Sequence, residues 1–206
     1  MFARSTTVHA DPARIDDGIR YVRDEVMPTV QDMAGCVGLS MMCDRQSGRC
    51  IVTTSWDSMD SMAASREGVR AMRDRAVEIM GGRMELQEWE IGVLHRAHRA
   101  PDGAACRVTW TRGEPARMDE MMETFRTTIM PRLDGLPGFC SVSVMGDRQS
   151  GMSVLTAVYD DRDAMQRSSG DVQTMHEQFL AQMGLEMMDT AEMEMVIHRL
   201  RVPEMA

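Results

Sequence analysis

The sequence contains no lysine and no asparagine, so all 23 of its basic residues are arginines. Lysine and asparagine have AT-rich codons, and their joint absence indicates a genome of high GC content. Aromatic residues are also scarce, with four Phe, three Trp and two Tyr among 206 residues. No apolar run reaches the roughly 18–20 residues that a transmembrane helix needs, and the first residues lack the apolar stretch of a signal peptide. We therefore expect a cytoplasmic protein with no membrane partner.

Positive charge is outnumbered throughout the chain. The formal net charge is −9 at pH 7, which argues against the clustered basic surface that nucleic-acid binding requires. Hydrophobic residues make up 43% of the chain, enough for a packed core and too many for a disordered chain. Five cysteines occur without a Cys-x-x-Cys pair. An odd number of thiols in a cytoplasmic chain indicates reduced cysteines that pack as small hydrophobic residues.

The chain is one sequence unit repeated after 103 residues. Residues 3–96 align with 106–199 without a gap, and 30 of the 94 aligned positions are identical. The hairpin segment Asp44–Gly48 (DRQSG) recurs as Asp147–Gly151. This identity indicates an internal duplication. The predicted domains are 1–96 and 106–206, the second with a short C-terminal tail. A linker of small residues, 97–105, joins them.

Each repeat predicts the same order of elements, βαββαβ. Strands are expected over about 3–9, 36–43, 50–56 and 84–96, and again over 106–112, 139–145, 153–159 and 187–199. Between them, apolar residues recur at helical spacing, and many of the 24 methionines fall on these stripes. Pro28 and Pro131 should bend the first helix of each repeat or mark its last turn.

This order predicts a four-stranded antiparallel sheet with both helices on one face, the ferredoxin-like arrangement of an α+β protein. The uncovered sheet face of a lone repeat would be exposed, which large apolar surfaces avoid. We therefore expect two tandem units packed sheet to sheet as an intrachain pseudo-dimer. Outer sheet edges would still permit a further homodimer.

Three short segments carry a family resemblance. They are Gly35-Cys36 and Pro137-Gly138-Phe139 before the second strand, the DRQSG hairpin, and the runs Trp56 to Met62 and Tyr159 to Met165 into the second helix. On these residues, both repeats resemble the antibiotic-biosynthesis-monooxygenase-like branch of the dimeric α/β-barrel superfamily. The resemblance implies an intrachain α/β barrel with a pocket between helices and sheet. The superfamily includes cofactor-free monooxygenases of quinols and polyketide phenols, and haem-degrading oxygenases.

Candidate pocket residues follow from strand alternation and from the aromatic positions. On the second strand of each repeat, small and flexible residues share one face, including Ser40, Met42, Ser143 and Met145. They either line a ligand pocket or belong to ordinary sheet packing. Before the second helix, Trp56 and Tyr159 either stack on a planar ligand or pack in the core. Trp110 has no aromatic counterpart in the first repeat.

His176 is the main candidate for chemistry. It lies on the second helix of the second repeat, where the first repeat has Arg73. It is either a surface residue or a general base suited to neutral pH. The resemblance to haem-degrading relatives implies an axial histidine on this helix, so haem binding through His176 is a further alternative. Those relatives also use an asparagine on the first strand, and this chain contains none.

Other polar groups are weaker candidates. His95 and His198 recur at the end of the last strand with no acid nearby in the sequence. Cys43 and Cys50 flank the first DRQSG turn, so they can face each other across the hairpin. They would form either a redox pair or, with Met41 and Met42, a site for a soft metal.

The family resemblance implies an oxidoreductase, a cofactor-independent monooxygenase acting on an aromatic, quinol or polyketide-like small molecule. His176 would be its base, and Ser143, Tyr159 and Trp110 its orienting groups. The alternative is a non-catalytic protein of the same fold that binds a small apolar molecule. No metal and no cofactor are expected, haem remaining the alternative noted above.

Overall fold

The computed structural model describes residues 1–200, so most of the predicted C-terminal tail lies outside the described residues. The first repeat forms β1 (Phe2–His9), α1 (Ile15–Tyr21), α2 (Met27–Gln31), β2 (Cys36–Asp44), β3 (Arg49–Trp56), α3 (Met59–Met80) and β4 (Arg83–Arg96). The second forms β5 (Ala105–Arg112), α4 (Met118–Thr124), α5 (Met130–Leu133), β6 (Phe139–Asp147), β7 (Met152–Tyr159), α6 (Arg162–Arg167), α7 (Ser169–Met183) and β8 (Glu186–Leu200). Every predicted strand is present, with ends within two residues of the prediction.

A π-helical turn interrupts the first helix of both repeats, over Val22–Val26 and Phe125–Ile129. Each turn directly precedes the Met-Pro pair that opens α2 or α5. Proline has no N–H to donate, and its ring clashes with the carbonyl four residues earlier in a regular helix. The wider turn accommodates this clash. The sequence predicts that Pro28 and Pro131 bend the helix or mark its last turn; each lies in the last turn, which ends at Gln31 or Leu133, and a π turn precedes it.

The second helix differs between the repeats. In the first repeat, α3 is continuous, and the Ser58 hydroxyl caps it by accepting from the Ser61 backbone N–H. In the second, the helix breaks at Ser168 into α6 and α7. Ser169-Gly170 stands there in place of Arg66-Glu67, and serine and glycine have lower helix propensities than arginine and glutamate.

The strands form a closed antiparallel barrel with the order β1-β3-β2-β8-β5-β7-β6-β4. This confirms the predicted α+β fold class. Among the described strands the closed order leaves no free edge for a second copy to extend. By contacts, the chain divides into a first unit, residues 1–89 with the end of β8 from residue 194, and a second unit, residues 90–193.

The long strands β4 and β8 change units along their length. The first unit contains the pairing of β2 with β8 from Glu194 onward. The second contains the pairing of β6 with β4 from Glu90 onward. The sheet of each unit is therefore completed by the end of the other repeat's last strand.

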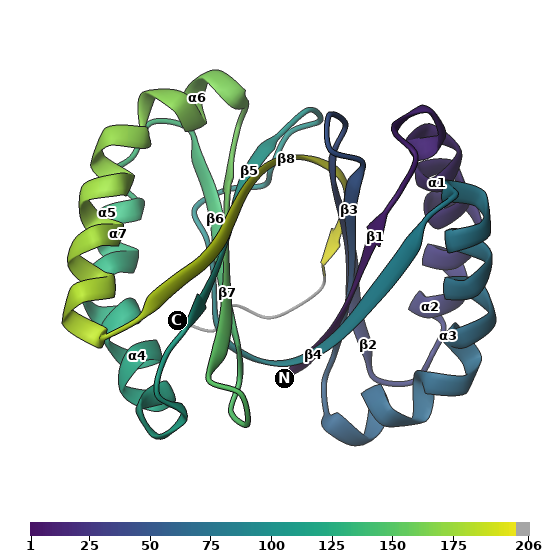
Figure 1. Ribbon diagram of the computed structural model, residues 1–206, viewed down its shortest axis with the longest axis horizontal. Coiled ribbons are helices and arrows are strands. Elements are labelled where there is room, and N and C mark those ends of the chain that lie inside the picture. Colours follow the sequence, from purple (N-terminus) through teal and green to yellow (C-terminus); the bar gives the residue numbers. More distant parts are fainter. Residues whose placement is uncertain (201–206) are drawn as a thin grey trace. The chain divides into compact units, whose positions relative to one another are not determined.

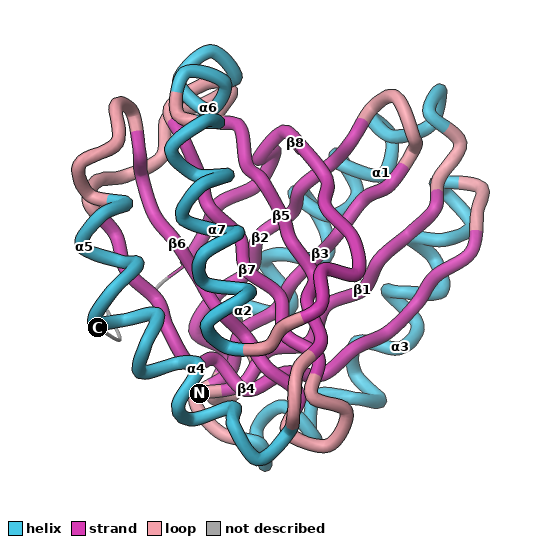
Figure 2. Tube along the Cα trace, turned by 60° about the vertical axis from the view of Figure 1, so that its left-hand side comes forward, coloured by secondary structure: helices cyan, strands magenta, loops and turns pink. Residues whose placement is uncertain are grey.

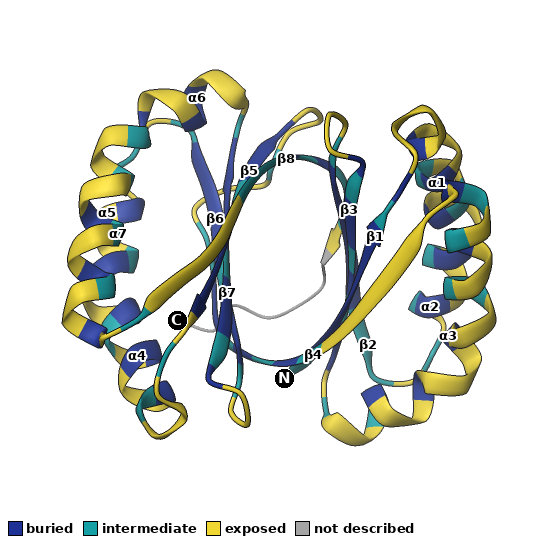
Figure 3. Ribbon diagram, viewed as in Figure 1, coloured by how far each residue is buried: buried dark blue, intermediate teal, exposed yellow. Residues whose placement is uncertain are grey.

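Within each unit the helices cover one face of the strands (Figure 1 and Figure 2). Figure 3 shows that the helices are buried on the side toward the strands and exposed on the other side. In the first unit Leu39, Met41 and Cys43 of β2 join the helix-facing core. In the second unit the corresponding core includes Val142 and Val144 of β6. Helical and strand periodicity in the sequence predicts these faces.

Candidate functional site

A cavity lies between the helices and the strands of the first unit. Its walls are apolar residues of the first helical segment, including Val22 and Val26, and of α3, including Ala76. Arg4 of β1 and Arg73 of α3 also line it. Its volume is about 40 Å³. The cavity therefore combines an apolar wall with two guanidinium groups.

The second unit has larger side chains at the corresponding positions. Phe125 replaces Val22 and Phe179 replaces Ala76. Their rings pack edge to face, with centroids 5.8 Å apart, and both belong to the helix-facing core. The same fold thus carries a cavity in one unit and a packed aromatic pair in the other.

Arg4 donates four side-chain hydrogen bonds inside the first unit. Only 2% of its side chain is exposed. Its Nη2 donates to Glu88 Oε1 at 2.8 Å and to the Met62 carbonyl at 2.8 Å, and its Nη1 donates to Ser65 Oγ at 3.0 Å. Glu88 also accepts from Arg66 at 2.9 Å. The two arginines hold the pKa of Glu88 below its ordinary value against the opposing effect of burial. The Glu88 carboxylate is therefore shared between two cations.

Arg73 has unmet hydrogen-bonding capacity. Its Nε and Nη1 atoms are buried and make no hydrogen bond to another protein group. Burial, together with repulsion from Arg4, lowers the pKa of the guanidinium from its ordinary value. Arginine stays protonated even so. A buried N–H group without an acceptor lowers the stability of the folded state. An anion in the cavity would provide acceptors for the two N–H groups of Arg73.

The second unit neutralises the equivalent place. Arg107, the counterpart of Arg4, donates to Glu192 at 2.8 Å and to Ser169 at 2.9 Å. His176 stands where the first unit has Arg73. Burial and the nearby Arg107 lower the pKa of His176 below 6.5, so its imidazole is uncharged at neutral pH. The excess positive charge is thus confined to the first unit.

These two ion pairs also correct the alignment of the last strand. The gapless repeat alignment matches Glu88 with Ala191, whereas the contacts match it with Glu192. The strand pairing shows the same offset: Met41 pairs with Ile197, whereas Val144, its counterpart in the second repeat, pairs with Val93. Both last strands carry a bulge at the equivalent place, so the bulge does not cause the offset.

The small and flexible strand residues of the prediction lie outside the cavity. Ser40 and Met42 alternate with the helix-facing Leu39 and Met41, so they occupy the opposite face of β2. Ser143 pairs with Leu94 and Thr156, and Met145 with Ile91 and Val154. Their assignment to a ligand pocket stays a prediction.

The aromatic candidates are buried in the two units. The Trp56 side chain is fully buried, and its Nε1 donates to Thr54 Oγ1 at 3.1 Å, a residue that lines the cavity. Tyr159 packs edge to face on Phe139, with ring centroids 6.2 Å apart. Its buried hydroxyl makes no hydrogen bond, and burial raises its pKa. Trp110 lies on β5 with 7% of its surface exposed.

His176 is half-buried on α7. Phe179, three residues after His176 on α7, packs on Phe125 in the helix-facing core. Haem binding through His176 stays a prediction.

The structure gives partners for His95 and for the two cysteines of the first hairpin. His95 Nε2 lies 2.7 Å from Asp134 Oδ1, an acid distant in sequence, so the histidine does have an acidic partner. Cys43 and Cys50 are direct cross-strand neighbours, as the hairpin predicts.

Sequence reasoning missed Arg4, Arg73 and the cavity walls. A usable signal exists in the repeat itself. Where one copy has Val22 and Ala76 and the other has two phenylalanines, the space between helix and sheet must differ.

In the described part of the chain, no helix has both the length and the apolar character needed to cross a bilayer.

No family model matches the sequence. Two Mycobacterium tuberculosis H37Rv proteins are similar over the full chain. Rv2557 is 43% identical over 205 residues, covering 92% of its own length, and Rv2558 is 42% identical over 206 residues, covering 87%.

Solved structures are similar in fold at low identity. An anthrone oxidase-like protein matches with a TM-score of 0.69 and 12% identity, covering 100% of this chain and 94% of that one. A ferredoxin-fold protein related to antibiotic biosynthesis monooxygenases from Listeria monocytogenes 4b F2365 has a TM-score of 0.55 and 6% identity (95% and 94%). A haem-degrading enzyme from Listeria monocytogenes has a TM-score of 0.52 and 7% identity (94% and 99%). These neighbours carry the dimeric α/β-barrel fold that the sequence predicts.

Proposed function

The chain belongs to the family of the Mycobacterium tuberculosis proteins Rv2557 and Rv2558 and has the dimeric α/β-barrel fold, and we propose that its first unit binds an apolar aromatic molecule with one acidic group. The observation that carries the proposal is Arg73, whose Nε and Nη1 are buried at an apolar cavity without an acceptor. A carboxylate, sulfonate or phenolate oxygen would accept from these N–H groups.

The local charge balance supports an anion. Arg4, Arg66 and Arg73 lie near the carboxylate of Glu88, which already accepts from the first two. Asp74 is the other acid whose charge acts on Arg73. A hydrogen bond to a charged group contributes about 1.5–3 kcal/mol. A ligand anion would also relieve the repulsion between Arg73 and Arg4.

The cavity has to widen for such a ligand. Its 40 Å³ compares with the roughly 30 Å³ of one water molecule and with the roughly 300 Å³ of a small ligand pocket. Met72 and Met80 line it, and methionine has three rotatable bonds that adapt to irregular shapes. We assign the widening to these two side chains.

The test uses 1-anilinonaphthalene-8-sulfonate, an apolar aromatic anion, at pH 8. Arg73→His introduces the residue of the second repeat, neutral at this pH, and should weaken binding roughly 10- to 100-fold through loss of the charged hydrogen bond. Ala76→Phe introduces the second repeat's phenyl ring and should abolish binding. Val77→Leu is the matched control, since it also copies the second repeat but does not line the cavity.

The neutral analogue N-phenyl-1-naphthylamine separates charge from apolar affinity. Arg73→His should leave its binding nearly unchanged, whereas Ala76→Phe should remove it. Near-UV circular dichroism identical to wild type shows that dye binding does not report loosened packing. Unchanged binding of the anion in both cavity variants would refute the proposal.

A second candidate function is cofactor-independent oxygenation, favoured by the uncharged imidazole of His176 beside Arg107. The imidazole would take a proton from a phenol or enol, the guanidinium would stabilise the anion, and that anion would react with O₂. Oxygen uptake with anthrone and hydroquinones, lost in His176→Gln, supports this. Oxygen uptake that persists in the variant would exclude His176 as the base. If the wild type takes up no oxygen, the oxygenase function is excluded and only the ligand-binding function remains. Haemin titration should give no Soret shift.

A further inference from the structure

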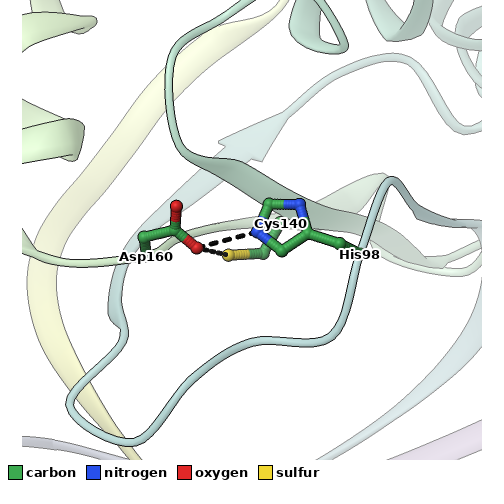
Figure 4. A group of neighbouring side chains, drawn as sticks. All are labelled: His98, Cys140 and Asp160. Carbon is green, nitrogen blue, oxygen red and sulfur yellow. Dashed lines mark hydrogen bonds and ion pairs between the residues drawn. The ribbon is translucent and has the colours of Figure 1, made fainter.

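Three side chains of different donor chemistry converge in the second unit, away from the cavity. They are His98 of the linker, Cys140 near the start of β6 and Asp160 directly after β7 (Figure 4). His98 Nε2 lies 2.7 Å from Asp160 Oδ1, and Cys140 Sγ lies 3.3 Å from the same oxygen. All three ligand atoms lie within 4.8 Å of one another.

The backbone holds these residues in place. The N–H groups of Ala97 and His98 donate to the Cys140 carbonyl at 2.9 and 3.2 Å. The Asp160 N–H donates to the Gly138 carbonyl at 2.8 Å. These hydrogen bonds attach the linker to β6, the strand that carries the Cys140 thiol. The backbone therefore places the three side chains close together without a bound metal ion.

We propose that His98, Cys140 and Asp160 bind a divalent zinc ion, with water in the fourth position. Imidazole nitrogen, thiolate sulfur and carboxylate oxygen are the zinc ligands, at about 2.0–2.3 Å from the metal. Tetrahedral bonds of that length separate ligand atoms by about 3.3–3.7 Å. The Cys140–Asp160 spacing of 3.3 Å already fits this range, and the His98–Asp160 spacing of 2.7 Å has to widen by about 0.6 Å. Magnesium and calcium prefer oxygen ligands alone.

Exposure permits metal entry from one side. The side chains of His98 and Asp160 are 46% and 40% exposed, whereas Cys140 is buried. On binding, the Cys140 thiol forms a sulfur–zinc bond and releases its proton to water.

A nucleophilic role for the same thiol is disfavoured. Burial and the neighbouring Asp160 raise the pKa of Cys140 to about 12, so no thiolate forms at neutral pH without a metal. The first repeat has Val37 at the position of Cys140, so the site belongs to the second unit alone.

Cobalt(II) titration of the purified full-length protein tests the site. A thiolate-to-cobalt charge-transfer band should grow to one equivalent and disappear when zinc displaces the cobalt. Cys140→Val, which copies the first repeat, and His98→Gln should lose the band. Each should bind zinc at least about 100-fold more weakly, because losing a residue that only orients a ligand already costs about 10- to 100-fold. Cys36→Ser is the matched control and should keep the band.

His98→Gln alters an exposed side chain and keeps the test valid if Cys140→Val fails to fold. Zinc should raise the Tm of the wild type and of Cys36→Ser, and leave that of His98→Gln unchanged. A wild type without the band, or a band that survives in both ligand variants, overturns the proposal.

Discussion

Replacing Phe179 with alanine tests the difference between the two units most directly. Phe179 is 7% exposed and packs edge to face on Phe125 at 5.8 Å. Phe-to-Ala changes in cores cost about 3–5 kcal/mol, and the aromatic pair adds about 0.5–1.5 kcal/mol beyond burial. We expect a loss of about 4 kcal/mol in the free energy of unfolding.

Urea unfolding followed by circular dichroism measures this loss. With a slope of about 3 kcal/mol per molar urea, the midpoint should fall by about 1.3 M. The exposed Met187→Ala (Met187 is 51% exposed) should change the free energy by less than about 0.5 kcal/mol. The variant should also gain affinity for apolar probes, because alanine recreates the first unit's wall.

A loss below about 1 kcal/mol in Phe179→Ala would refute this account of the packing. It would mean that the packing of the second unit does not depend on the aromatic pair.

Three further predictions concern titratable groups. Arg4 and Arg66 lower the pKa of Glu88, so its carboxylate stabilises the folded state fully above the unfolded pKa of about 4.3. This stabilisation is lost as the pH falls through the lower pKa of the folded state. In acid unfolding, the free energy of unfolding of Glu88→Gln should therefore depend less steeply on pH than that of the wild type. Burial lowers the pKa of His176 from its ordinary value of 6.5. Just below pH 6.5 the imidazole therefore takes up a proton in the unfolded chain but not in the folded one, so the free energy of unfolding should fall as the pH is lowered through this range. An NMR titration of the folded protein should place the pKa of His176 below 6.5, and a value above 6.5 would contradict the burial. Burial raises the pKa of Cys106 to about 12, so this thiol should resist a disulfide reagent at pH 8 until urea unfolds the protein, and rapid labelling of it in the native state would count against the core.

Much of the fold could be predicted because its signals are local. The turn DRQSG recurs, and in the structure Asp44 and Asp147 accept from backbone N–H groups two residues ahead in each copy. The helix stripes of the two repeats keep one phase, which only a buried helix face explains. Such patterns depend on neighbours in sequence, so duplication doubles their evidence.

The candidate site could be predicted only in part. His176 was identifiable as a helix residue, but its neutral state depends on Arg107, which is 69 residues away and on another element. Arg4 and Arg73 belong to β1 and α3 and become a site only when the helix packs on the strand. Contacts of this kind have no periodic trace in the chain.

By itself the sequence determined the duplication, the βαββαβ order and the buried helix faces, since hydrophobic periodicity and turn chemistry act over a few residues. Tertiary structure alone decided that β4 and β8 each serve two units, that the last strands are offset by one residue, and that His98 meets Cys140 and Asp160. It also decided that the cavity of the first unit is lined by Arg73, whose Nε and Nη1 have no acceptor on the protein. These outcomes depend on the volume and charge of residues distant in sequence, which only the packed chain brings within a few ångströms of each other.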